Sequence, residues 1–185
     1  MRGFPRTVGV VIAAGACALA ASTLAAYSSG PPPGHTAGFG EPACNACHYD
    51  YVLNEAGAVI RLDSLPRHYT AGQTYPLTLV VRHTELKRGG FQLSARLADG
   101  TQAGAFVIAD TLLLTVRGKA GIDYLSHTMA GADRLSGDSI TWRFLWVAPA
   151  SRQGVVFNVA VNVANRDASE FGDRIFARSF ETSAQ

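Results

Sequence analysis

Two cysteines and a histidine form the pattern Cys44-Asn45-Ala46-Cys47-His48. Covalent attachment of a c-type haem uses this spacing, because the two thiols can form thioethers with the two vinyl groups while the adjacent imidazole binds the iron. We therefore expect one covalent haem c, attached through Cys44 and Cys47, with His48 as the proximal iron ligand. Two alternatives stay open: a disulfide or two free thiols, and half of a zinc site that needs two further ligands.

The opposite face of such an iron would be filled by a second side chain or left open to a small ligand. His127 is the first choice for a second iron ligand, and His127 and Met129 would face the same side if their segment is extended. The other candidates are His35, His68, His83 and Met129. A filled position favours electron transfer, whereas an open one favours small-molecule sensing or peroxide chemistry.

The first residues resemble a secretory leader. Arg2 and Arg6 precede an uncharged run that ends in small residues, so we expect a signal peptide over residues 1–26, cut after Ala25 or Ala26. The alternatives are an uncleaved anchor and lipid attachment at Cys17. We therefore expect a periplasmic or extracellular protein of the cell envelope, with membrane association only through an uncleaved leader.

The charge balance excludes one class of partner. Removing Arg2 and Arg6 from the 16 basic residues leaves 14, against 14 acidic ones. No basic cluster remains that could neutralise several phosphates, so we expect no binding to nucleic acid.

No other motif indicates chemistry. The sequence has no Gly-x-Ser-x-Gly elbow and no phosphate-binding loop, so we expect no enzyme activity. Asn162, Asn165, Asp167 and Asp173 could gather oxygen ligands for calcium, although polar turns between strands are common.

The remaining sequence predicts an extended arm followed by an all-β domain. Residues 27–57 are rich in Gly, Pro and Ser and carry the Cys-x-x-Cys-His motif, whereas short segments of alternating apolar residues fill 58–185. Strands are predicted at 75–82, 91–97, 105–108, 112–116, 142–146, 155–163 and 174–180, with a hairpin at Asp99-Gly100 joining the second and third. Trp142, Phe144 and Trp146 share one face and are expected in the core. This pattern favours an immunoglobulin-like antiparallel β-sandwich.

Short segments spread over most of the chain resemble a known family. They are the stretch from Ser29 to His48, Tyr69 to Tyr75, Gly90-Phe91-Gln92-Leu93, His127-Thr128, Trp142 to Pro149 and Gly154 to Phe157. Their order is similar to that in the bacterial Reeler-like proteins of the choice-of-anchor V type. The resemblance implies a Reeler-type sandwich and export, but no particular activity. Eukaryotic Reeler domains carry further cysteines within the sandwich, and this sequence has none there.

The leading hypothesis is an exported monohaem c-type protein that transfers electrons. It would work with a redox partner protein or as an accessory subunit of a larger envelope redox complex. The alternative is a non-enzymatic envelope module for binding or adhesion, in which Cys44 and Cys47 form a disulfide.

Overall fold

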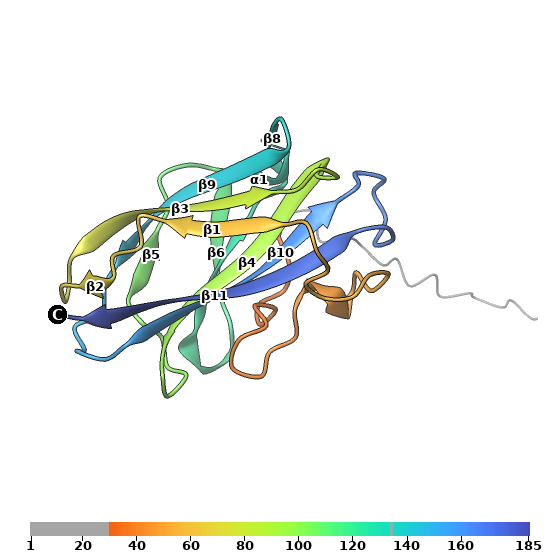
Figure 1. The fold of residues 1–185 in the computed structure, drawn as a ribbon. Coiled ribbons are helices and arrows are strands. Elements are labelled where there is room, and N and C mark those ends of the chain that lie inside the picture. Colours follow the sequence, from red (N-terminus) through yellow and green to blue (C-terminus); the bar gives the residue numbers. More distant parts are fainter. Residues whose placement is uncertain (1–29, 134) are drawn as a thin grey trace, which may run out of the picture.

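The computed structural model describes residues 30–133 and 135–185, so the predicted leader over residues 1–26 lies outside the described part. Two β-sheets pack face to face (Figure 1). The smaller sheet has the order β1-β3-β9-β5, with β8 paired to β9, and the larger has the order β2-β11-β10-β4-β7-β6. Every pairing is antiparallel except the short one between β2 and β11. The prediction of an antiparallel β-sandwich is therefore confirmed.

The elements follow the alternating segments of the sequence. The smaller sheet consists of β1 (Val59–Asp63), β3 (Thr74–Arg82), β5 (Ala105–Val107), β8 (Leu135–Ser136) and β9 (Ser139–Val147). The larger consists of β2 (His68–Tyr69), β4 (Arg88–Leu97), β6 (Leu113–Arg117), β7 (Asp123–His127), β10 (Val155–Ala164) and β11 (Arg174–Ala184). The short helical turns are η1 (Cys44–Ala46), η2 (Lys119–Gly121) and α1 (Met129–Ala132). No helix in the described ranges is long and apolar enough to span a bilayer.

The core lies between the two sheets and is built around aromatic side chains. Trp142, Phe144 and Trp146 on β9 are buried together, as predicted. Trp146 meets Phe157 of β10 edge to face, with ring centroids 5.0 Å apart, and Trp142 lies 4.6 Å from Phe91 of β4. Such aromatic contacts add to the stabilisation from buried apolar area. The large side chains of β9 therefore fill the space between the two sheets.

The predicted hairpin between residues 91–97 and 105–108 is wrong. After β4 the chain turns at Gly100, but β5 crosses to the other sheet and pairs with β9. Two contacts account for the crossing. Ala103 is fully buried and its carbonyl accepts a hydrogen bond from the Trp146 indole at 3.0 Å. Gly104 has a φ of +76°, and a Cβ there would lie 2.1 Å from the Val147 carbonyl oxygen.

The segment after β7 is not extended through Met129. The β7 strand ends at His127, and the Thr128 hydroxyl then accepts a hydrogen bond from the Gly131 N–H, which caps the single turn of α1. Because of this turn, Met129 is exposed and does not share a strand face with His127. The expectation that both residues face one side is therefore corrected.

The arm lies along the outer face of the larger sheet, the face turned away from the core (Figure 1). Alternate residues of β4 that a solvent-facing strand would expose, Gln92, Ser94 and Arg96, are buried as a result. The arm backbone comes close to β10 at Gly38, which has no side chain. A Cβ on Gly38 would lie 2.2 Å from the Asn158 side chain. Both faces of β4 and β10 are therefore covered.

Candidate functional site

The Cys-x-x-Cys-His motif forms a tight turn on the outer face of the larger sheet. The η1 turn packs against β10 and β11, and the Cys44 carbonyl accepts hydrogen bonds from the N–H groups of Cys47 at 3.2 Å and His48 at 3.0 Å. Ala43, just before η1, is buried with Ala160 and Ile175. The turn is thus anchored by a small apolar cluster, and its backbone is closed by two hydrogen bonds to one carbonyl.

The two cysteines have different surroundings. Cys44 is half-buried against the Ala43, Ala160 and Ile175 cluster, whereas Cys47 is exposed, and the two thiols are not bonded to each other. Burial raises the pKa of the Cys44 thiol to about 12, so this thiol is protonated at neutral pH and is a poor nucleophile.

In protein produced without haem, we expect alkylating reagents to modify Cys47 well before Cys44. The exposed Cys47 is open to the reagent, while Cys44 must first lose its packing and then its proton. Peptide mass spectrometry of timed iodoacetamide reactions at pH 8, with denatured protein as the control, measures the order. Equal rates in the native protein would contradict it.

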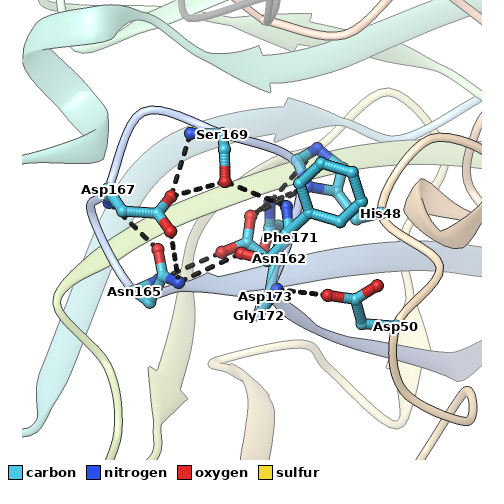
Figure 2. Close-up of polar contacts among 9 residues, drawn as sticks. All are labelled: His48, Asp50, Asn162, Asn165, Asp167, Ser169, Phe171, Gly172 and Asp173. Carbon is cyan, nitrogen blue, oxygen red and sulfur yellow. Dashed lines mark hydrogen bonds and ion pairs between the residues drawn. The ribbon is translucent and has the colours of Figure 1, made fainter.

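His48 is held by a buried carboxylate (Figure 2). Its Nδ1 lies 2.8 Å from Oδ2 of Asp173, whose side chain is 2% exposed. Asp173 also accepts hydrogen bonds from the Asn162 amide at 2.9 Å and the Asn165 N–H at 3.1 Å. The Asn162 amide nitrogen is 3.4 and 3.5 Å from the two ring nitrogens, too long and too evenly shared to orient the ring. A proton on Nδ1 facing Asp173 leaves Nε2 as the nitrogen able to bind a metal.

The loop before Asp173 forms a network of its own rather than a set of converging oxygen atoms. The Asn165 amide donates to Asp167 and to the Phe171 carbonyl, and Ser169 donates to Asp167 (Figure 2). These bonds help to position Asp173 just before β11. Over residues 30–133 and 135–185, no three Cys, His, Asp or Glu side chains are grouped so that they could hold one metal ion.

A pocket of about 390 Å³ opens beside the motif. Its floor is the outer face of β4 and β10, and its walls are the arm and the 165–173 loop. The residues that line it include Cys44, Cys47, His48, His35, His127 and Asp173. The volume lies within the range of about 300–1,000 Å³ of small-molecule and cofactor sites. The structure thus brings together the motif and two of the histidines considered as a second iron ligand.

His127 reaches the pocket from the end of β7 and is 9% exposed. Its Nδ1 accepts a hydrogen bond from the Phe91 N–H at 2.9 Å and lies 3.2 Å from the Phe91 carbonyl oxygen. Burial lowers the pKa of His127 to about 4, so the imidazole is neutral at pH 7, as a metal ligand must be. Gly90 makes room for the ring, because a Cβ there would lie 2.8 Å from Cε1 and 3.2 Å from Nε2.

His35 lines the same pocket from the arm. Its Nδ1 donates to the Pro32 carbonyl at 3.0 Å, and its N–H donates to Gln92 at 2.6 Å. The Gln92 amide in turn donates to the Pro32 carbonyl at 3.0 Å. The buried Gln92 thus fastens this part of the arm to β4.

The other candidates for a second iron ligand lie outside the pocket. His68 on β2 is bonded to the Ser183 hydroxyl at 2.7 Å. His83 is buried, and its Nδ1 accepts from the Glu85 N–H at 3.1 Å. Met129 is exposed at the start of α1. None of the three is close enough to the motif's pocket to line it.

A second set of contacts, which we name the arm clamp, consists of Glu41, Arg96 and Tyr124. Glu41 accepts short hydrogen bonds from Arg96 and Tyr124 and a third, at 2.6 Å, from Thr36. The Arg96 guanidinium also lies over the ring of Phe39, 5.1 Å from its centroid. The arm clamp ties the residues just before the motif to β4 and β7.

The arm clamp shifts two pKa values. Burial acts to raise the pKa of Glu41, but the hydrogen bonds from Thr36, Tyr124 and Arg96 outweigh it and hold this pKa below its usual value of 4.5. The pKa of Tyr124 is raised to about 12, first by burial and second by its hydrogen bond to Glu41. At neutral pH the arm clamp is therefore a carboxylate with three donors.

Comparisons with known proteins bear on the fold. The sequence matches no protein-family model and no curated protein. Among solved structures, the Reelin-N domain of F-spondin matches with a TM-score of 0.52 and 19% identity, over 76% of this chain and 96% of that chain. The human F-spondin reeler domain matches with a TM-score of 0.50 and 21% identity, over 72% of this chain and 94% of that chain. The sandwich is Reeler-like.

Three residues of the site were missed by sequence reasoning. Asp173 was considered only as a calcium ligand, and Gly90 and Gln92 only as parts of a family marker. Each of them supports a histidine of the pocket: Asp173 contacts His48, Gly90 leaves space for the His127 ring, and Gln92 accepts a hydrogen bond from the His35 N–H. For Gly90 and Gln92 the available signal was a glycine or polar residue at an outward position of β4, but it indicates a covered face only when the covering segment is known. Asp173 lies just before β11 and is outside this pattern.

Proposed function

We propose that this chain is an exported monohaem c-type protein that transfers electrons in the cell envelope. The observation that supports it most is the pocket shared by Cys44, Cys47, His48 and His127. Two thiols and an imidazole of the attachment motif border the same cavity as a buried, neutral second imidazole. Two imidazoles can supply both axial ligands of a six-coordinate haem iron, and the two thiols can supply the covalent bonds to the porphyrin.

The chemistry of the pocket fits the group. Cys44 and Cys47 would carry the thioether bonds, and His48 and His127 would bind the iron through Nε2. The floor at Gly89 and Gly90 has no side chains, and Phe91 continues it. When bound, a haem would supply a one-electron centre, while the chain would hold the two imidazoles, whose identity and hydrogen bonds contribute to the reduction potential.

His127 would have to change its tautomer to bind through Nε2. Its Nδ1 accepts the Phe91 N–H in this structure, which leaves the ring proton on Nε2. Moving that proton to Nδ1 redirects Nδ1 to the Phe91 carbonyl oxygen, 3.2 Å away. The same backbone residue can therefore hold either tautomer.

The setting of this function is also a proposal. The leader-like residues 1–26 and the segments that resemble bacterial Reeler-like proteins of the choice-of-anchor V type support export to the periplasm or the cell surface. The chain would act without enzyme activity of its own, alongside a redox partner or within a larger envelope complex.

The first test is haem attachment. We expect the full chain, exported by a host with haem c maturation proteins, to be red, to keep its haem after denaturation, and to gain the mass of one haem. The variant with Cys44→Ala and Cys47→Ala should be colourless at a similar yield. Absorption spectra and intact mass measure both. Colourless wild-type protein with unmodified thiols would refute the proposal.

A disulfide would favour the alternative function. Cys44 and Cys47 lie in one turn, which is closed by the hydrogen bond from the Cys47 N–H to the Cys44 carbonyl. A disulfide between the two thiols would therefore need little movement of the backbone. If the native protein loses two hydrogens at this pair and binds no haem, a non-enzymatic binding or adhesion module becomes the better proposal.

A further inference from the structure

We propose that Asp173 is a positioning residue for the iron ligand: its carboxylate holds the Nδ1–H of His48 and makes that imidazole a more electron-rich ligand, which lowers the reduction potential of the centre. This inference rests on the proposed function. It assigns to the chain a strongly electron-donating proximal ligand rather than an ordinary imidazole.

The geometry of Asp173 is fixed from several sides. Oδ2 lies 2.8 Å from His48 Nδ1 and accepts the Asn162 amide at 2.9 Å, while Oδ1 accepts the Asn165 N–H at 3.1 Å. The side chain is only 2% exposed. Water therefore has little access to the carboxylate, and the carboxylate cannot turn away from His48 without losing its other donors.

The direction of the effect follows from charge. A carboxylate that accepts the Nδ1 proton pushes electron density toward Nε2 and raises the basicity of the imidazole. Burial strengthens this interaction, because the screening by water is reduced. A more basic ligand stabilises the oxidised metal more than the reduced one, so the potential falls.

The nearby polar groups allow a comparison of two opposite changes. Asn162 competes with His48 for Oδ2 of Asp173, since both donate to the same oxygen. Replacing Asp173 by a neutral amide weakens the acceptor for His48. Removing the Asn162 donor strengthens it. The two substitutions should shift the potential in opposite directions.

The main test is redox titration of the haem-loaded protein. We expect Asp173→Asn to raise the potential so that the ratio of reduced to oxidised protein at a fixed applied potential rises about tenfold, which is about 59 mV for a one-electron couple. Asn162→Leu, similar in size, should lower the potential. Asp138→Asn is the charge-matched control, because Asp138 pairs with Arg82 at the edge of the smaller sheet and is not part of the 165–173 loop, and it should leave the potential unchanged.

A second measurement does not depend on haem. In the haem-free wild-type chain, ¹⁵N NMR should find His48 with its proton on Nδ1, and Asp173→Asn should shift the population toward the Nε2–H tautomer. If Asp173→Asn does not fold, the Asn162→Leu titration and the wild-type tautomer decide the matter. Absence of haem from the wild type would overturn the proposed function. A loaded, folded Asp173→Asn variant with an unchanged potential, or an Nε2–H tautomer in the wild type, would overturn this inference alone.

Discussion

Glu41→Gln is expected to lower the free energy of unfolding by about 3 kcal/mol. The substitution keeps the shape of the side chain but removes its charge, which leaves the buried Arg96 guanidinium without its carboxylate partner. Breaking a buried ion pair from one side costs about 3–5 kcal/mol. We expect a loss at the lower end of this range because the Glu41 side chain is 14% exposed. Arg96 also keeps its hydrogen bond to Tyr124. Urea unfolding followed by tryptophan fluorescence measures the change.

The matched control is an exposed ion pair of the same chain. Arg61 and Asp63 form a pair with side chains 58% and 43% exposed, so Arg61→Met should leave the free energy of unfolding nearly unchanged. The double variant Glu41→Gln and Arg96→Met should recover part of the loss, because it no longer buries an unpaired charge. Equal small effects for Glu41→Gln and Arg61→Met would show that the arm clamp does not stabilise the fold.

The pH dependence gives the arm clamp a distinct signature. The pKa of Glu41 is lower in the folded protein than its usual value of 4.5, so the stabilisation is fully present above about pH 4.5 and is lost as the pH falls through the folded-state pKa. The stability difference between the wild type and Glu41→Gln should therefore be constant near neutral pH and shrink in acid. A difference that grows in acid would contradict the assignment.

The core could be predicted from the sequence because alternation reports burial on one face of a strand. The stripe of Trp142, Phe144 and Trp146 and the alternating residues of β10 lie where the period of two requires. The crossing of β5 could not be predicted, because Asp99-Gly100 favours a tight turn whichever strand follows. The partner of β5 is decided by the burial of Ala103 and its bond to Trp146, contacts between distant parts of the chain.

The burial of the outer face of the larger sheet was harder to predict from the sequence than the core. Gln92, Ser94 and Arg96 are polar, and a polar alternate position normally means a solvated face. Here their polar groups meet the arm instead: Gln92 holds the Pro32 and His35 backbone, and Arg96 holds Glu41. Gly- and Pro-rich composition correctly indicates a segment without strands, but it says nothing about the surface on which such a segment lies.

The Cys-x-x-Cys-His motif could be found because its three residues are close in sequence, whereas the residues that support it are remote. His48 is adjacent to Cys47, but its partner Asp173 comes from the far end of the chain through the pairing of β10 with β11. His127 is likewise remote in sequence from the motif, and it was preferred among five candidates without knowledge of the pocket. The fold then brings it to the pocket through β7, beside the glycine that leaves space for its ring.

His127→Ala is expected to change the spectrum of the haem-loaded protein completely, from low-spin in the wild type to high-spin. The substitution removes a buried imidazole that is neutral above about pH 4 and whose Cε1 and Nε2 edge lies over Gly90 at the pocket floor. No other side chain of the described pocket is held in this position, so the iron would lose its sixth ligand. Because the imidazole needs no deprotonation between pH 5 and 8, the wild-type spectrum should be constant across that range.

Two further variants separate ligation from general damage. His35→Ala is the matched control, since His35 lines the same pocket but is held by Pro32 and Gln92 of the arm and sheet, and it should leave the low-spin spectrum in place. Gly90→Val keeps His127 but puts a side chain against its ring, where even a Cβ would lie 2.8 Å away, so it should reproduce the high-spin spectrum. A low-spin spectrum that survives His127→Ala but is lost in His35→Ala would identify His35, in the arm, as the second iron ligand. The arm clamp would then control ligation as well as stability, because it holds the arm on the sheet.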